Sequence, residues 1–490
     1  MTYKDEFGKL CIENKIDIDK LGYEKLEVIN EDNYFKPLIL QIKDFINQDK
    51  EDIVFSVKDI KIYAKKKEFK KKPKQITGKV FNNKIYQAEL FIKDNPLFYD
   101  KHKLWWLWNK EKFKYEMVDE VDILNLIEEQ TNIDIIKSTE RNEIVNALKQ
   151  KGRLNIPKDA KESWVQFKNK IYDITTEEVF DATPEYFITN PVNLNLGKSE
   201  ETRALDILFE SWVGKEHVQE LYELLAFGLV PCYFIHRIFC LIGSGANGKS
   251  TFLRVLEKFL CEENITSSSL ILLLKTRFEG SKLLKKLVCL MGETHFDMIS
   301  NTDFLKKVTG QDLVRAEFKG KDGFDFRNYA KLIIATNSLP PTADKTTGFY
   351  RRWKILEFPN KFDKETDVLF NVSDEEYENL ALKCLNLAKK LWRERLFTND
   401  GDFEERKKNY EEKSNPLMKF IKEKYERNID SETFFQEFFE DLNNYLEERG
   451  YRTLSAIVVS RQIKAEGFDI KSLSKEGKNG RFILGLKTKD

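Results

Sequence analysis

The sequence contains few cysteines and histidines, and these are scattered along the chain. Six cysteines and four histidines occur in 490 residues, and no two cysteines form a CxxC pair. Structural zinc sites need closely spaced Cys and His ligands, and structural disulfides belong to oxidising compartments. We therefore expect a protein of a reducing compartment, the cytoplasm, with no zinc site.

Long apolar runs are also absent. The most apolar stretch, residues 226–242, is interrupted by Pro231, His236 and Arg237. The first ten residues, MTYKDEFGKL, lack the basic-then-apolar pattern of a signal peptide. A membrane-spanning helix needs about 20 predominantly apolar residues. We expect no membrane partner.

Neither sign of charge is in excess. Lys plus Arg and Asp plus Glu each total 82, so the formal net charge is zero. No global basic field draws the chain onto nucleic acid, and any such binding must be local. One basic tract, AKKKEFKKKPK from Ala64 to Lys74, is either a solvated linker or a nucleic-acid-binding arm.

The length and an apolar content of 41% suffice for three or four domains. Residues 1–100 alternate short apolar runs with lysines, and residues 101–200 combine aromatic-rich strands with helical patterns, which favours an α+β module. In residues 201–370, short apolar strands alternate with helices, which is typical of a largely parallel α/β sheet. Residues 371–414 indicate a helical linker. Residues 415–490 suggest three helices and a β-hairpin, a winged-helix-like pattern.

The strongest motif is a glycine-rich loop between an apolar strand and an amphipathic helix. Gly243, Gly248, Lys249 and Ser250 satisfy the pattern GxxxxGK[ST]. Such glycines let the backbone curl so that its N–H groups face phosphates. We predict that Lys249 contacts the β- and γ-phosphates of ATP and that Ser250, or less favourably Thr251, ligates Mg²⁺. The predicted nucleotide-binding residues are Gly243, Ser244, Gly245, Ala246, Asn247, Gly248, Lys249, Ser250 and Thr251.

Two polar residues end apolar strands downstream of the loop. Glu293 ends LVCLMGE and Asn337 ends KLIIATN. Ligands of open α/β sheets bind at the carboxyl ends of strands, so Glu293 is a candidate to orient Mg²⁺ or the attacking water. Asn337 is a candidate to bond the γ-phosphate or its water. An ordinary strand-end carboxylate and a turn-forming Asn are the alternatives.

Basic residues stand at two further places. Arg351 and Arg352, in FYRRW, precede an apolar strand and could supply a guanidinium to the ATP of a neighbouring subunit, or could form a surface salt-bridge pair. Between Thr302 and Asn328, two apolar-alternating arms flank a basic turn with Lys319 and Lys321, which predicts a hairpin. Its tip is either a solvated turn or a DNA contact.

Together these segments resemble the core of superfamily 3 helicases, in the phage and plasmid primase-helicase branch that includes poxvirus-type enzymes. The matching segments are GSGANGKST, LVCLMGE, FLKKVTGQDLVRAEFKGK, KLIIATNSLPP and TGFYRRW, and they cover about residues 200–365. Upstream, residues 167–190 resemble the element that precedes this core, with Lys170 where Gly is usual.

The resemblance implies an AAA+ P-loop ATPase core and a role for each motif. Lys249 and Ser250 would bind nucleotide and Mg²⁺, Glu293 would be the second-motif acid, Asn337 the sensor, Arg351 or Arg352 the finger, and Lys319 and Lys321 the DNA-contacting lysines. It also implies a hexameric ring with ATP between subunits, translocating 3′ to 5′ on single-stranded DNA.

The expected function is therefore an ATP-dependent DNA helicase that replicates a virus, phage or plasmid-like element, in the host cytoplasm if viral. Its expected partners are single-stranded, fork or origin DNA and a separate primase or polymerase. The alternatives are an ATP-dependent initiator or origin-binding scaffold without processive unwinding, and a small-molecule phosphotransferase. Asp17 and Asp19 form a DxD, which we interpret as surface acids rather than a primase centre.

Overall fold

The computed structural model describes most of the chain, which divides into two compact units. The described residues are 3–13, 35–36, 38–40, 42–43, 52–57, 60–65, 83–131, 137–292, 299, 302–362, 368–449, 451, 453–475 and 477–489. The first unit comprises Met1–Lys84 with Leu126–Ile135, and the second comprises Ile85–Asn125 with Ile136–Asp490.

The elements of the first unit include a helix and a hairpin. These are α1 (Tyr3–Glu13) and the antiparallel strands β1 (Asp52–Val57) and β2 (Ile60–Lys65), and further described residues between 35 and 43 are helical. The basic tract begins at the end of β2, but its residues 66–74 lie outside the described residues, as do Asp17 and Asp19.

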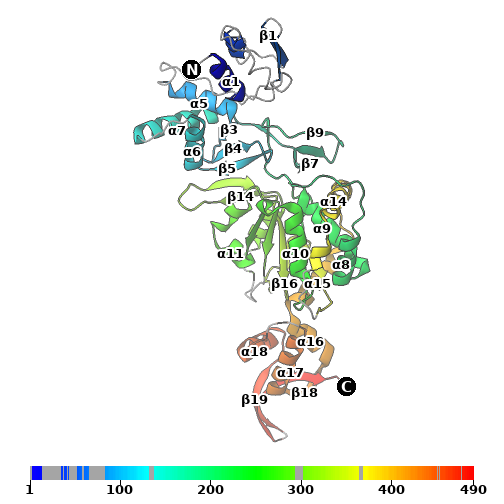
Figure 1. Ribbon diagram of the computed structural model, residues 1–490. Coiled ribbons are helices and arrows are strands. Elements are labelled where there is room, and N and C mark those ends of the chain that lie inside the picture. The colour runs from blue at the N-terminus through cyan, green and yellow to red at the C-terminus, as the bar shows by residue number, and fades with distance from the viewer. Residues whose placement is uncertain are drawn as a thin grey trace. The chain divides into compact units, whose positions relative to one another are not determined.

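The second unit begins with an aromatic α+β module (Figure 1). Its helices are α5 (Lys84–Asp94), the first half of α6 (Glu120–Thr131) and α7 (Ser138–Gly152), and α6 continues into the first unit from Leu126. One antiparallel sheet contains β3 (Leu97–Tyr99), β4 (Trp105–Asn109) and β5 (Lys114–Val118), and a second contains β7 (Trp164–Phe167), β8 (Lys170–Asp173) and β9 (Val179–Asp181). The short strands β6 (Lys158–Asp159) and β10 (Tyr186–Phe187) pair in parallel.

The start of this module differs from the sequence-based boundary at residue 100. Strand β3 pairs with β4, with Tyr99 opposite Trp105, and Phe98 is buried with Trp106 and Tyr115. The chain from Ile85 therefore belongs with the module. The boundary was placed too late because a three-residue strand is too short to show alternation.

The centre of the second unit is a five-stranded, all-parallel sheet. Its strand order is β12-β13-β16-β11-β17. The strands are β11 (Ile238–Ile242), β12 (Ile265–Ser268), β13 (Val288–Met291), β16 (Lys331–Thr336) and β17 (Trp353–Glu357). The parallel sheet and the strands predicted around residues 238–243, 287–293 and 331–337 are thus confirmed.

Helices cover both faces of this sheet (Figure 1). Phe239 and Leu241 of β11 pack toward α8 (Arg203–Val213), α9 (Val218–Leu229), α10 (Lys249–Leu260) and α14 (Asp374–Glu394). Ile238, Cys240 and Ile242 pack toward α11 (Leu270–Lys275), α12 (Asp303–Thr309), α13 (Thr347–Tyr350) and α15 (Phe403–Ser414). Burial on both faces explains why these strands are continuously apolar.

Residues 371–414, expected as a helical linker, are part of this core instead. Helix α14 contributes seven buried side chains and packs against α9. Helix α15 buries Tyr410, which contacts Phe349 and Trp353 and donates its hydroxyl to the Pro340 carbonyl at 2.8 Å. The expectation was wrong for α15 because its single fully buried residue leaves a charged helix without an apolar period.

The C-terminal region forms its own hydrophobic cluster from three helices and a three-stranded sheet. Along the chain the elements are α16 (Pro416–Lys424), β18 (Tyr425–Phe434), α17 (Phe435–Glu448), α18 (Ala456–Ala465), β19 (Ile470–Lys475) and β20 (Lys478–Thr488). The sheet is antiparallel, in the order β18-β20-β19. The three helices and the hairpin are as predicted, whereas β18 was missed because its sequence, YERNIDSETF, is mostly polar.

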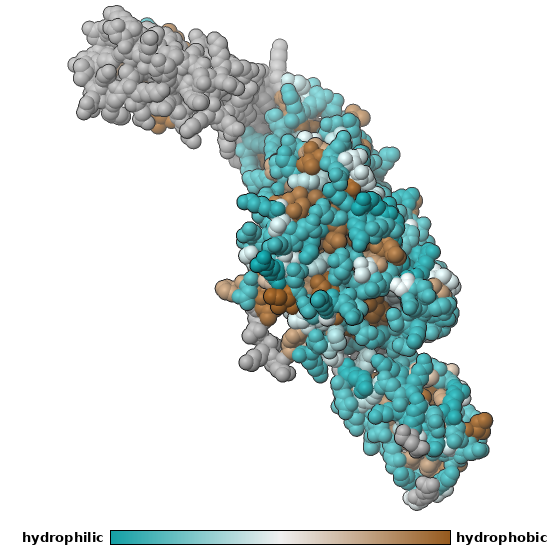
Figure 2. All heavy atoms as spheres, turned by 90° about the vertical axis from the view of Figure 1, so that its right-hand side faces the viewer, coloured by the Kyte–Doolittle hydropathy of each residue, from teal (hydrophilic) through white to brown (hydrophobic). Residues whose placement is uncertain are grey.

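The surface agrees with the polar composition of the chain. Figure 2 shows a face that is hydrophilic over most of the described residues, with scattered apolar side chains. Among the helices in the described part of the chain, none has the length and apolarity needed to cross a bilayer.

Candidate functional site

The predicted phosphate loop, residues 243–251, lies between the carboxyl end of β11 and the first turn of α10. A Cβ atom on Gly243 would lie 1.8 Å from Nδ2 of Asn247, and one on Gly248 would lie 2.4 Å from Cδ1 of Trp212. Gly248 also has a φ of 91°, in the left-handed region. Glycine is therefore required at both positions, for space at the first and for space and φ at the second.

Lys249, the first residue of α10, folds back over the loop. Its Nζ donates to the Gly243 carbonyl at 2.6 Å and to Asn247 Oδ1 at 2.9 Å. Asn247 is buried and donates its Nδ2 to the Phe358 carbonyl, just beyond β17, at 3.2 Å. Asn247 thus holds the Lys249 ammonium against the loop, and sequence reasoning gave Asn247 no such positioning role.

The loop presents open backbone donors. The N–H groups of residues 244–248, 250 and 251 make no hydrogen bond to any residue that the structure describes. Gly245 and Ala246 have positive φ of 96° and 48°, so successive N–H groups turn inward as in an anion-binding nest. The positive end of the α10 dipole lies at the same place. This arrangement is suited to a polyphosphate.

The residues around the loop fit the Mg²⁺ ion that accompanies ATP. Among the described residues, no three Asp, Glu, His or Cys side chains are grouped to hold a metal. Mg²⁺ at nucleotide sites needs only one or two protein oxygens beside phosphate and water. The exposed Ser250 hydroxyl, at the start of α10, makes no hydrogen bond within the described chain and is such an oxygen.

Asn337 lies beside the loop. Its strand, β16, is the neighbour of β11, and Thr336 is paired with Ile242, the residue before Gly243. The Asn337 side chain is half-buried and makes no hydrogen bond to another described residue. Its carboxamide is therefore available to bond a ligand at the carboxyl ends of the strands. A sensor role for Asn337 stays a prediction.

Glu293 lies outside the described residues. The strand before it, β13, ends at Met291, which is paired with Ile334 of β16. The end of β13 is consequently at the same edge as the loop, with β16 between them. The roles predicted for Glu293 in catalysis and metal binding stay predictions.

The two arginines lie at the amino ends of the strands, opposite the ends that carry the loop, and their environments differ. They precede Trp353, which pairs with Ile238 at the start of β11, roughly 13 Å along the strand from the loop. Arg352 is buried, and its guanidinium donates to Thr309 Oγ1 at 2.8 Å and to the carbonyls of Gly348 and Lys306. Burial lowers the Arg352 pKa. Arg351 is exposed.

The predicted basic hairpin is present at this second edge. Strands β14 (Leu313–Ala316) and β15 (Phe324–Arg327) pair antiparallel, with Ala316 opposite Phe324. Lys319 and Lys321 are both exposed in the connecting turn. Strand β15 ends at Arg327, shortly before β16 begins at Lys331, so the hairpin lies at the end of the sheet opposite the phosphate loop.

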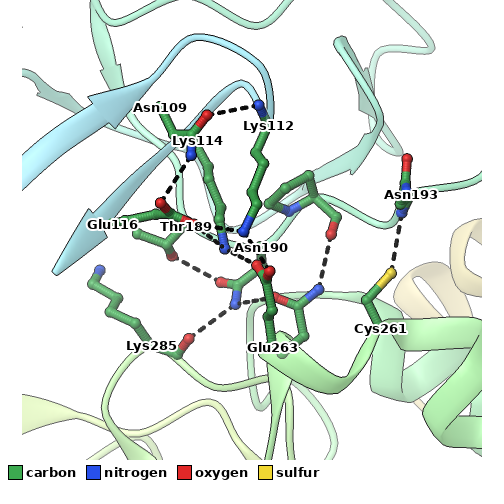
Figure 3. A network of polar contacts seen from close by, with 12 residues as sticks. Asn109, Lys112, Lys114, Glu116, Thr189, Asn190, Asn193, Cys261, Glu263 and Lys285 are labelled. Atoms are coloured by element: carbon green, nitrogen blue, oxygen red, sulfur yellow. Dashed lines mark hydrogen bonds and ion pairs between the residues drawn. The ribbon is translucent and has the colours of Figure 1, made fainter. Parts of the chain in front are cut away.

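A polar junction that sequence reasoning missed joins the aromatic module to the end of α10 (Figure 3). Lys112 Nζ contacts Glu263 at 2.6 Å, and the buried Lys114 also contacts Glu263. These two lysines hold the pKa of Glu263 down at about 2. No local motif signals this junction because the partners are about 150 positions apart.

A second part of the junction is built from amides (Figure 3). Asn190 donates to Asn264 Oδ1 at 3.0 Å and to the Lys285 carbonyl at 2.9 Å. Asn264 is buried and donates to the carbonyls of Pro191 and Leu260, the latter being the last residue of α10. The helix that starts at the phosphate loop is therefore fastened to the module at its other end.

Comparisons with known proteins add two sequence matches. A family described as "Family of unknown function (DUF5906)" matches residues 241–352. A protein of Acanthamoeba polyphaga mimivirus with the name "Putative helicase" is 25% identical over 223 residues, which cover 43% of this chain and 23% of that protein. This chain therefore corresponds to less than a quarter of the length of that relative.

Two similar solved structures are both of the C-terminal region of NrS-1. An A-form apo structure aligns with a TM-score of 0.42 and 15% identity, over 82% of this chain and 98% of the other. A second apo structure aligns with a TM-score of 0.42 and 14% identity, over 82% and 99%.

Proposed function

We propose that this chain is an ATP-driven DNA helicase of the superfamily 3 type, which replicates a virus, phage or plasmid-like element. The phosphate loop carries the proposal, because glycine-dependent curvature, open N–H groups and Lys249 come together at the start of α10. The parallel sheet with helices on both faces supports an AAA+ core. Similarity to the mimivirus protein named as a helicase supports the reaction class.

The proposed hydrolysis divides the work among the residues at the carboxyl edge. Lys249 and the loop N–H groups bind the β- and γ-phosphates, and Ser250 and Glu293 hold Mg²⁺, which neutralises phosphate charge. Glu293 also orients the attacking water, and Asn337 bonds the γ-phosphate or that water. Electrostatic stabilisation of the transferring phosphoryl group is the main catalytic term in such sites.

The proposal also requires a second subunit. Arg351 is exposed and lies at the edge remote from the loop of its own chain, so it is the arginine suited to reach the ATP of a neighbour. Arg352 is already bonded inside the protein and supports the local structure. We propose a closed ring, as the helicase resemblance implies, with the Lys319 and Lys321 hairpins in contact with the translocated DNA strand.

A Lys249→Ala variant tests the proposal. It should reduce ATP hydrolysis more than about 100-fold, because the positive charge on the phosphates is lost. Lys258→Ala, at the exposed far end of the same helix, is the matched control and should hydrolyse ATP at the wild-type rate. Hydrolysis by Lys249→Ala at the wild-type rate, in a protein with an unchanged melting temperature, would overturn the nucleotide site.

An initiator without processive unwinding is a second candidate, favoured by the C-terminal region. Its order of helix, strand, two helices and a hairpin supports a winged-helix fold. Arg461 and Lys464 are exposed on α18, and Lys471 and Lys475 are exposed on β19. A fork-unwinding assay separates the two candidates: strand separation dependent on ATP supports the helicase, whereas an origin footprint without strand separation supports the initiator.

A further inference from the structure

A basic turn of the aromatic module lies between β3 and β4. Asp100 stabilises this turn through three hydrogen bonds. Its Oδ1 accepts hydrogen bonds from the N–H groups of His102 and Leu104, each at 2.9 Å, and its Oδ2 accepts one from Nε1 of Trp106 at 2.9 Å. Lys103 takes a left-handed φ of 61°. The Asp100 carboxylate is thus occupied by two backbone N–H groups and the Trp106 side chain, while residues 101–103, Lys-His-Lys, are exposed.

This turn meets the tip of the β14–β15 hairpin. Lys103 Nζ contacts Asp322 Oδ2 at 2.7 Å, and the His102 ring lies 5.3 Å from the Phe324 ring, centroid to centroid. Phe318 of the hairpin packs against the buried aromatic cluster of the module. The hairpin lysines and the turn lysines, more than 200 positions apart, therefore belong to one surface.

The charge of this surface is positive and poorly compensated. Lys101, Lys319 and Lys321 form no ion pair with any residue in the described part of the chain. Asp322 is the acid in contact with Lys103, and their side chains are 82% and 64% exposed, so the pair is open to solvent and weak. An incoming phosphate can compete for Lys103 at little cost.

We propose that the turn at residues 101–103 and the hairpin tip form one composite surface for the phosphate backbone of single-stranded DNA. This inference rests on the proposed function, which assigns DNA to the hairpin, and adds the upstream module to the DNA path. Asp322 holds Lys103 in the absence of DNA and releases it when a phosphate binds. A fixed turn beside the hairpin extends the contact by one or two phosphates.

Substitutions that remove a positive or a negative charge test the surface. The measurement is equilibrium binding of a fluorescent dT oligonucleotide at a series of salt concentrations. Each lysine–phosphate contact on a single strand contributes about 0.7 to the slope of log K against log salt. Lys101→Ala should make this negative slope less steep by about 0.7. Asp322→Asn should tighten binding with an unchanged slope, since Lys103 contacts a phosphate in both proteins but no longer has to leave Asp322. Lys158→Ala, an exposed lysine elsewhere on the module, should leave the slope unchanged.

The outcomes separate this inference from the proposed function. If Lys319→Ala and Lys321→Ala weaken binding while Lys101→Ala and Asp322→Asn match the wild type, the hairpin assignment stands and the composite surface is wrong. If none of the four variants changes the slope, both are wrong. A less steep slope for Lys101→Ala is the outcome that a DNA contact confined to the hairpin does not explain, whereas loss of the Asp322 charge would by itself tighten binding.

Discussion

At the scale of single residues, the two adjacent arginines differ in burial, since Arg351 is exposed and Arg352 is buried. Arg351→Ala should lower ATP hydrolysis about 1,000-fold with an unchanged melting temperature, since a guanidinium finger contributes at least that much. Arg352→Ala should instead destabilise the fold by about 3 kcal/mol, because it leaves Thr309 and two carbonyls without their buried donor. Steady-state hydrolysis and thermal unfolding of both variants measure this.

Arg203→Ala is a suitable control because that side chain is 83% exposed on α8. It should retain both hydrolysis and stability. An exchange of the two phenotypes, with Arg351→Ala unfolded and Arg352→Ala inactive but stable, would contradict the assignment.

We expect a second residue, Lys331, to link stability to pH. It is fully buried in β16, where Nζ donates to the Val230 carbonyl, and burial lowers its pKa from 10.5 to about 7. The unfolded chain binds more protons than the folded chain between these values, so stability rises with pH from about 7 to 10.5. From pH 7 to 9 the rise is on the order of 2 kcal/mol.

Lys331→Met should remove this rise. The measurement is the free energy of unfolding in urea at pH 7 and pH 9 for both proteins. The difference between wild type and variant cancels the contribution of other titrating groups. Equal responses of the two proteins to pH would show that Lys331 keeps its proton in the fold.

At the scale of elements, α15 distinguishes a linker from a core helix. Asp402 and Glu405 form a capping box at its start, and Tyr410 is its fully buried side chain. Asp402→Ala should cost about 1 kcal/mol, as losses of helix caps do, and Tyr410→Ala about 3–5 kcal/mol, as for other buried aromatic residues. Urea unfolding of the two variants measures both costs.

Lys408→Ala, exposed on the same helix, should change stability by less than about 0.5 kcal/mol. If Tyr410→Ala were as stable as Lys408→Ala, α15 would be a linker as the charged sequence suggested. The capping box shows why this helix can form without an apolar stripe, since its end is stabilised locally.

At the scale of the whole molecule, the loop and Arg351 lie at opposite ends of the strands of one sheet, so the finger role proposed for Arg351 requires a second chain. Lys249→Ala and Arg351→Ala should each be inactive alone. A 1:1 mixture should recover about one quarter of the wild-type ATPase, because a quarter of randomly formed interfaces pair an intact loop with an intact arginine. ATP hydrolysis after mixing and reassembly measures this.

Recovery should disappear when the mixture is diluted below the concentration at which subunits associate. Mixing Lys249→Ala with a Lys249→Ala, Arg351→Ala double variant is the control and should recover nothing. No recovery in the first mixture, although size measurements show mixed oligomers, would indicate that Arg351 does not act between subunits.

The sequence by itself determined the glycine-rich loop and the strands that carry it. Gly243, Gly248, Lys249 and Ser250 lie within eight residues, and the chemistry of such a loop is local, so spacing alone identifies it. The apolar strands around residues 238, 288 and 331 are equally legible, because burial on both faces requires continuous apolar runs. The basic hairpin was predicted from its alternating arms.

Only the tertiary structure decided the features that join distant parts of the chain. The different burial of Arg351 and Arg352, the insertion of Tyr410 into the core, and the contact of Lys103 with Asp322 have no local signature. Burial and ion pairing depend on which surfaces meet after the sheet has assembled, and spacing along the chain does not encode that. The position of the glycine-rich loop could therefore be predicted from the sequence, whereas the contacts between distant parts of the chain could not.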